Sequence, residues 1–180
     1  MRQSVQVALF ASLCAALGFL LAPIPNIELF TFGLFMAGYA LGAGGGAKAA
    51  MLAVILYYGM NPYGSSLIFP PLFAAQLIAG VFISSLGALA RRVLPPRAGR
   101  SWWRLPALLP FAALAALALP LLPSLAFAWV GGGSWEGWMA LGLLMTAWGF
   151  VFNLLVFTAG FEPLARQMTR LDLGGEPHGG

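Results

Sequence analysis

Charged side chains are scarce in this sequence. Of its 180 residues only 8% are charged while 61% are hydrophobic, and the mean hydropathy is +0.88. A water-soluble domain carries about 25% charged residues, because its surface must face water. The scarcity of charge therefore excludes an ordinary soluble domain. It indicates an all-α integral membrane protein, in which apolar helices have lipid as their solvent.

Residues that carry catalytic or metal chemistry are equally few. The only histidine is His178, in a polar tail, and the only cysteine is Cys14, inside an apolar run. One histidine excludes a histidine-based metal centre and a serine–histidine catalytic pair, and one cysteine excludes an internal disulfide. The Gly-rich segment 42–48 lacks the spacing and the Ser or Thr of a nucleotide-binding P-loop. We predict no enzymatic activity, no catalytic or metal-ligating residues and no cofactor.

What the sequence has instead is a series of apolar runs, separated by segments rich in proline, glycine and asparagine. They predict six membrane-spanning helices that form one bundle domain over residues 1–170. The predicted spans are 5–22, 27–41, 47–60, 67–90, 105–122 and 137–160. The second and third are short for about 30 Å of hydrocarbon, so we expect them to lie deep in the bundle or to extend into their loops. Residues 171–180 are polar and Gly-rich and predict a disordered cytoplasmic tail.

The basic residues predict the orientation of these spans. With the N-terminus inside the cell, six spans place every Lys and Arg on the cytoplasmic side: Arg2, Lys48, Arg91, Arg92, Arg97, Arg100, Arg104, Arg166 and Arg170. Short cytoplasmic loops are enriched in such residues, so we expect both termini in the cytoplasm. Cations confined to short loops also argue against a nucleic-acid partner. Among the acids, Glu28 and Glu136 fall outside, whereas Glu162, Asp172 and Glu176 fall in the tail after the last span.

The predicted outer loops gather polar and aromatic residues, namely Asn26, Glu28, Asn61, Tyr63, Trp129 and Trp135. Loops that converge above a bundle can line a ligand pocket with aromatic walls and a few polar groups. Tryptophan and tyrosine also anchor helix ends at the membrane interface, and this alternative stays open for Trp129 and Trp135. Glu28 is either a ligand contact, a solvent-exposed group at the membrane edge or a helix N-terminal carboxylate. Thr31 shares its helical stripe and is a further candidate ligand contact.

Two amides, Gln76 and Asn153, lie at depth within predicted spans. Polar side chains in lipid point into the bundle, where they hydrogen-bond between helices or contact a ligand. In the first span, Ala11 and Ala15 form a pair of small residues four positions apart. Such a pair lets a second helix approach closely, either within the chain or on a partner.

The order of several motifs resembles a known family. PNIELFTF at 25–32, GYALG at 38–42, NPYG at 61–64, PP at 70–71 and AQ at 75–76 together resemble the substrate-binding S-components of energy-coupling factor (ECF) vitamin transporters. The similarity covers residues 5–92, and beyond them only the topology agrees. The short Gly-rich inner loop at 42–46 departs from the family, in which relatives often carry a Pro-Arg pair.

The resemblance implies a multi-pass protein of a bacterial or archaeal cytoplasmic membrane. It implies a vitamin pocket beneath the outer loops, with walls that include Asn26, Glu28, Asn61, Tyr63 and Gln76. It also implies that Ala11 and Ala15 dock onto a membrane coupling subunit driven by two ATPase subunits. The bundle would capture a cobalamin-, thiamine- or riboflavin-like compound and deliver it by reorientation. The alternative is a non-transport scaffold protein of the cell envelope with similar topology.

Overall fold

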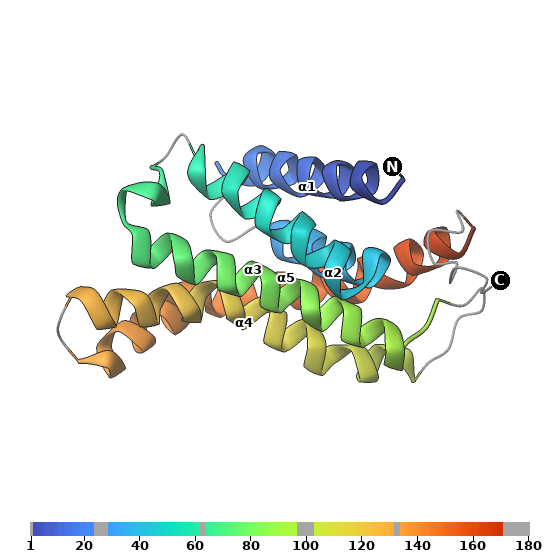
Figure 1. Cartoon of the computed structure of the whole chain (residues 1–180). Helices are drawn as coiled ribbons and strands as arrows, with labels where there is room; N and C mark the ends of the chain where they lie inside the picture. The colour runs from blue at the N-terminus through green and yellow to red at the C-terminus, as the bar shows by residue number, and fades with distance from the viewer. Residues whose placement is uncertain (1, 24–28, 62–63, 97–102, 132–133, 171–180) are drawn as a thin grey trace.

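The computed structural model describes residues 2–23, 29–61, 64–96, 103–131 and 134–170, and this part of the chain is helical (Figure 1). The elements are α1 (Arg2–Leu21), α2 (Phe30–Gly59), the 3-10 helix η1 (Ser66–Ile68), α3 (Pro70–Val93), α4 (Arg104–Gly131) and α5 (Trp135–Arg170). The five α-helices are each long and apolar enough to cross a membrane. The chain is therefore an α-helical, multi-pass membrane protein in its composition and architecture, as the sequence predicts. The predicted tail lies outside the described residues.

Helix α2 contains a reversal of the chain at Gly42. Gly42 has φ 72° and ψ −178°, a conformation that residues with a side chain rarely adopt, and it separates two helical segments, 30–41 and 43–59. The two segments lie against each other: a Cβ added to Gly46 would be only 2.5 Å from the Cα of Gly38. The sequence predicts a turn over residues 42–46. The structure turns at Gly42, and residues 43–46 already belong to the second segment.

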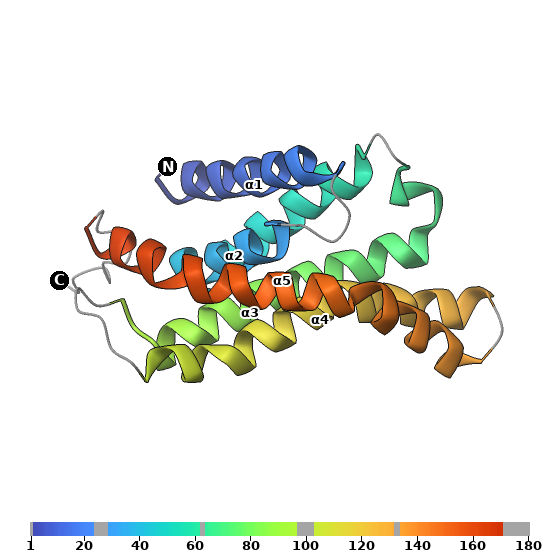
Figure 2. The ribbon, with the colours of Figure 1, turned by 180° about the vertical axis from the view of Figure 1, so that it is seen from behind.

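Because of this reversal, the first and the last helix have their free ends at the same end of the bundle. Figures 1 and 2 show that α5 finishes at the same end of the bundle at which α1 starts. Five unbroken helices running up and down would place these ends on opposite sides, whereas α2 divided into two antiparallel segments places them on one side. The helical segments correspond in order to the six predicted spans. That all six cross a bilayer, with cytoplasmic termini, stays a prediction.

The end of the bundle at which α1 starts is called the basic end below. There α2 reverses, α3 ends and α4 begins. The basic side chains that the structure describes lie within two helical turns of it: Lys48, Arg91, Arg92, Arg104 and Arg166. This clustering has the form expected of a cytoplasmic face.

Segment 30–41 is the central element of the bundle. Almost all of its side chains are buried, and it is about 18 Å long at 1.5 Å per residue, too short to reach both faces of a bilayer. Its Phe30 ring lies 4.7 Å from that of Tyr57, and its Phe35 ring lies 5.0 Å from that of Phe157 in α5. Of the two alternatives for this short span, the structure therefore shows the deep one.

Helix α1 lies along one side of the bundle and packs on α2 (Figures 1 and 2). A Cβ on Gly33 would be 2.9 Å from the sulfur of Cys14, which shows how closely the two helices approach. Large apolar side chains cover the outside of several helices, with Leu9, Ile78 and Leu155 each more than 60% exposed. Apolar patches of this extent on helices of membrane length are the surface that lipid covers.

We predict that Gly38→Ala destabilises the bundle whereas Gly44→Ala does not. A Cβ at Gly38 would overlap the backbone carbonyl of Ser84 in α3, and backbone cannot move aside as a side chain can. Overpacking of this kind costs about 1–3 kcal/mol. Gly44 has open space around its Cβ position and a helical backbone, so alanine there is neutral or slightly stabilising. Thermal unfolding midpoints in detergent measure both, and equal midpoints for the two variants would contradict the close crossing.

Candidate functional site

The structure brings three of the predicted ligand-binding residues into the interior. Thr31 of α2, Gln76 of α3 and Asn153 of α5 are 0%, 6% and 3% exposed. Thr31 is the second residue of segment 30–41, so it marks the depth at which the central segment begins. Its neighbour Phe30 packs on Tyr57 and Tyr58, which places these aromatic rings at the same level.

Gln76 and Asn153 lie near this level as well. Asn153 is one helical turn before Phe157, whose ring is 5.1 Å from that of Phe32. Gln76 is one turn before Gly80, and a Cβ on Gly80 would be 2.7 Å from the side chain of Val54. Phe157 contacts segment 30–41, and Gly80 contacts segment 43–59. Asn153 and Gln76 each lie one helical turn further from the basic end than these two residues. They lie where segment 30–41 starts.

The two amides keep an acceptor atom without a partner. Gln76 Oε1 and Asn153 Oδ1 are buried, and neither has a hydrogen-bond partner among the described residues. Asn153 Nδ2 donates to the Gly149 carbonyl at 3.0 Å, within its own helix. An unsatisfied buried acceptor costs about 1–3 kcal/mol, and buried polar atoms normally find a protein, water or ligand partner. Hydrogen bonding between helices, the alternative role for these amides, does not use these two oxygens in this structure.

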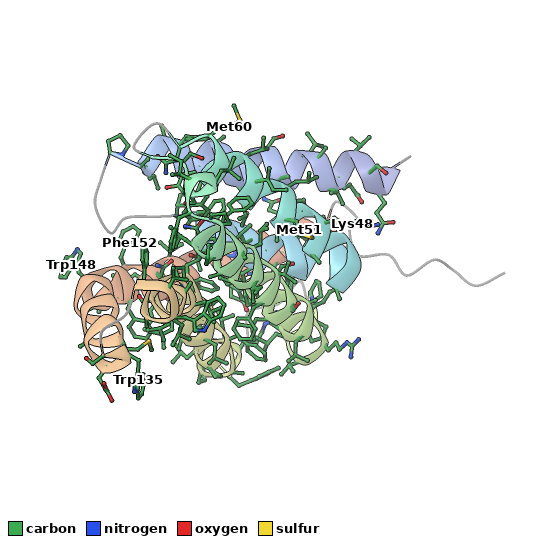
Figure 3. The ribbon with its side chains drawn as sticks, turned by 60° about the vertical axis from the view of Figure 1, so that its left-hand side comes forward. Lys48, Met51, Met60, Trp135, Trp148 and Phe152 are labelled. Atoms are coloured by element: carbon green, nitrogen blue, oxygen red, sulfur yellow. The ribbon has the colours of Figure 1, made fainter. Side chains whose placement is uncertain are left out.

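The other predicted ligand residues are not part of this group. Asn26, Glu28 and Tyr63 lie outside the described residues, and Asn61 is partly buried directly after α2. Trp129 and Trp135 are 84% and 60% exposed, and Figure 3 shows Trp135 pointing away from the bundle. Their exposure at the end opposite the basic end favours anchoring at the membrane interface.

The small-residue pair of α1 faces inward. Ala11 and Ala15 are 2% and 5% exposed and lie in the contact of α1 with α2. The prediction that they form an exposed docking face does not fit this arrangement, in which they serve internal packing. Small residues that are exposed on α1, on the stripe beside this contact, are Ser4, Ala8, Ser12 and Ala16. This set recurs every four positions and is called the exposed α1 stripe below.

A separate hollow of about 560 Å³ lies between α1, segment 30–41 and α5. Its lining includes Phe10, Leu13, Phe32 and Met168 and contains no charged or amide side chain. A specific small-molecule site needs a few placed polar groups to fix the orientation of its ligand. The hollow therefore does not replace the level of Gln76 and Asn153 as the candidate site.

The basic end contains a polar cluster that sequence reasoning missed. Arg104, at the start of α4, is 1% exposed, and its Nε lies 2.7 Å from Oε1 of Glu162 in α5. Its Nη1 and Nη2 donate to the carbonyls of Pro95 and Leu94, at 3.0 and 3.2 Å. The Leu94 carbonyl also accepts from the hydroxyl of Tyr39 at 2.6 Å. One arginine thus connects the end of α3 with α4, α5 and the central segment.

Glu162 corrects the predicted topology of the last helix. The sequence places it in a tail after residue 160, whereas α5 continues to Arg170 and buries Glu162 to 8% exposure. Arg166, one turn later, lies 3.7 Å from its second carboxylate oxygen. The spacing of Glu162 and Arg166 by four residues was the available signal, because such pairs face each other on a helix.

Comparisons with protein-family models, curated protein sequences and solved structures find no match.

We predict that Glu162→Gln destabilises the bundle far more than Arg166→Gln. The first change leaves the buried Arg104 charge without its counter-charge, and breaking a buried pair in this way costs about 3–5 kcal/mol. The second removes a partner whose side chain is 37% exposed, and such pairs contribute about 0–1 kcal/mol. Denaturant or thermal unfolding in detergent measures the difference. Equal losses would show that Arg104 does not depend on Glu162.

Proposed function

We propose that this chain is the substrate-binding membrane subunit of an ECF-type vitamin importer. The observation that carries the proposal is the pair of buried, unpartnered amide oxygens of Gln76 and Asn153. They lie on α3 and α5, which both contact α2, at about the depth at which segment 30–41 begins and the Phe30, Tyr57 and Tyr58 rings pack together. Apolar walls with a few polar groups are the usual design of a small-molecule pocket.

The arrangement also supports the direction of binding. The level of Gln76 and Asn153 lies on the side of the bundle away from the basic end, so a ligand enters from outside when the basic end is cytoplasmic. The aromatic rings near Thr31 offer faces for stacking on a flat vitamin or precursor of the cobalamin, thiamine or riboflavin kind. Delivery follows from reorientation of the whole bundle by a membrane coupling subunit and its two ATPases. The chain itself binds ligand without hydrolysing ATP.

We place the contact with the coupling subunit on the exposed α1 stripe. Transmembrane helices associate closely where small residues allow their backbones to approach. Ala8 and Ser12 are small and exposed, whereas Ala11 and Ala15 are already covered by α2. The docking function inferred from the family is thus kept on α1 but moved from Ala11 and Ala15 to the exposed α1 stripe beside them.

We expect Gln76→Met and Asn153→Leu to weaken ligand binding without unfolding the chain. Each replaces an amide whose oxygen has no partner among the described residues with an apolar group of similar size, which costs little folding free energy. Each variant should bind the ligand roughly tenfold to hundredfold more weakly than the wild type, because a donor group of the ligand then lacks its acceptor. Equilibrium binding of labelled riboflavin, thiamine and cobalamin to the purified chain measures this. The control is Gln167→Met, at an exposed position of α5. Unchanged affinity in both test variants would remove Gln76 and Asn153 from the site.

Uptake by cells separates transport from the scaffold alternative. Cells that express the chain together with a coupling module should accumulate a labelled vitamin, and cells without the module should not. Ser12→Trp should abolish uptake and leave binding by the isolated chain within about twofold, because a bulky side chain blocks only the outer face. Ala11→Trp should lower the stability of the chain itself, because that position is 2% exposed. Uptake that never exceeds the background for any vitamin would favour a scaffold.

A further inference from the structure

A hollow of about 760 Å³ opens at the basic end, between α2 and α3. The start of segment 43–59 forms one wall with Gly42 and Ala43. The last turns of α3 form the other wall with Ser85, Leu89 and the arginines 91 and 92. The hollow adjoins the Arg104–Glu162 cluster at Pro95, but neither Arg104 nor Glu162 lines it, and neither the candidate site nor the exposed α1 stripe includes it.

Two arginines bring positive charge to the hollow, and Arg92 is the exposed one. Arg91 is held at its edge, since its Nη1 donates to the Ala40 carbonyl at 2.9 Å. Arg92 is exposed and makes no ion pair with a described residue. The described acids are elsewhere, with Glu162 bound to Arg104 and Glu136 in the first turn of α5 at the opposite end. Two guanidinium groups in one hollow select an anion with several oxygen acceptors, such as a phosphate.

The start of segment 43–59 adds to this preference. The first N–H groups of a helix have no acceptor within the helix, and the helix dipole makes this end positive. Gly44 has open space around its Cβ position, so an anion can approach the backbone there. This contribution supports the arginines, whose charge is the main attraction.

A second hollow, of about 430 Å³, lies between the same two helices nearer the middle of the bundle. Ile78, Val81 and Phe82 line it on α3, one turn before Ser85, and Met51 lines it on the α2 side. Ile78 and Phe82 are 62% and 42% exposed, so this apolar groove faces lipid. A charged hollow and an apolar groove therefore follow each other along one α2–α3 seam.

We propose that this seam binds an anionic phospholipid. The phosphate headgroup occupies the hollow at Arg91 and Arg92, and one acyl chain lies along the groove at Val81 and Phe82. Basic pockets between transmembrane helices on the cytoplasmic side are the places where anionic lipid headgroups bind. A free phosphate would use only the first hollow, and the apolar continuation is the reason for preferring a lipid. The bound lipid would join segment 43–59 to α3 beside the reversal at Gly42.

The test is titration of the purified full-length chain with phosphatidylglycerol or phosphatidylcholine, followed by native mass spectrometry. Wild-type protein should bind phosphatidylglycerol more tightly than phosphatidylcholine. Arg92→Gln should weaken phosphatidylglycerol binding about fivefold and leave phosphatidylcholine unchanged. The matched control is Lys48→Gln, which removes a cation that projects from α2 near the same end and does not line the hollow (Figure 3). Equal effects of the two variants would show unspecific surface attraction and overturn the proposal.

A second pair of variants tests the acyl-chain part. Val81→Trp fills the groove and should weaken phosphatidylglycerol binding at least fivefold, whereas Leu155→Trp on the lipid-facing side of α5 should not. Inorganic phosphate at millimolar concentration should displace the lipid poorly. If phosphate binds as tightly as the lipid and Val81→Trp has no effect, the hollow is a free-anion site and the lipid assignment is wrong. Unfolding midpoints equal to wild type confirm that the variants are folded.

Discussion

The peptide backbones of α2 and α3 meet without intervening side chains at Gly38, Gly46 and Gly87. A Cβ at Gly87 would overlap the Phe35 carbonyl, and one at Gly46 would be 2.5 Å from both Gly38 Cα and Ser84 Oγ. This contact holds segment 30–41 in the middle of the bundle. From there its Phe35 and Tyr39 rings reach Phe157 and Phe161 of α5. In lipid the hydrophobic effect does not drive helices together, so close packing of this kind has to provide much of the association energy.

The sequence predicted those parts of the fold that depend on the pattern of consecutive residues. Apolar runs and their Gly and Pro breaks located the helices, and the glycines at 42–46 located the reversal. The inward face of α1 had no such signal. That helix is apolar on all sides and carries small residues on neighbouring stripes, so periodicity could not choose between Ala11 and Ala8. The Arg104–Glu162 pair was hidden for a different reason: it joins residues 58 positions apart (162 − 104), and only the tertiary fold brings them together.

Buried polar groups lie at two levels of the bundle. At the basic end the Tyr39 hydroxyl and the Arg104 guanidinium share the Leu94 carbonyl, and Arg104 also forms an ion pair with Glu162. At the level of Gln76 and Asn153, amide oxygens remain without partners among the described residues, and the neighbouring contacts are aromatic and apolar. At the basic end, by contrast, Arg104 and Tyr39 join α2, the end of α3, α4 and α5.

The start of the central segment bears on the chemistry of the ligand proposed above. Segment 30–41 begins inside the bundle, and its N-cap residue Leu29 supplies no side-chain cap. In other transporters, helices that begin at membrane depth direct their positive N-terminal ends at acceptor groups of the substrate. The oxygens of Gln76 and Asn153, by contrast, need hydrogen-bond donors. A ring whose edge alternates donors and acceptors satisfies both demands, as the pyrimidine-derived rings of thiamine- and riboflavin-like compounds do. A hydrocarbon or a polyanion would leave both oxygens unpaired, at a cost of about 1–3 kcal/mol for each.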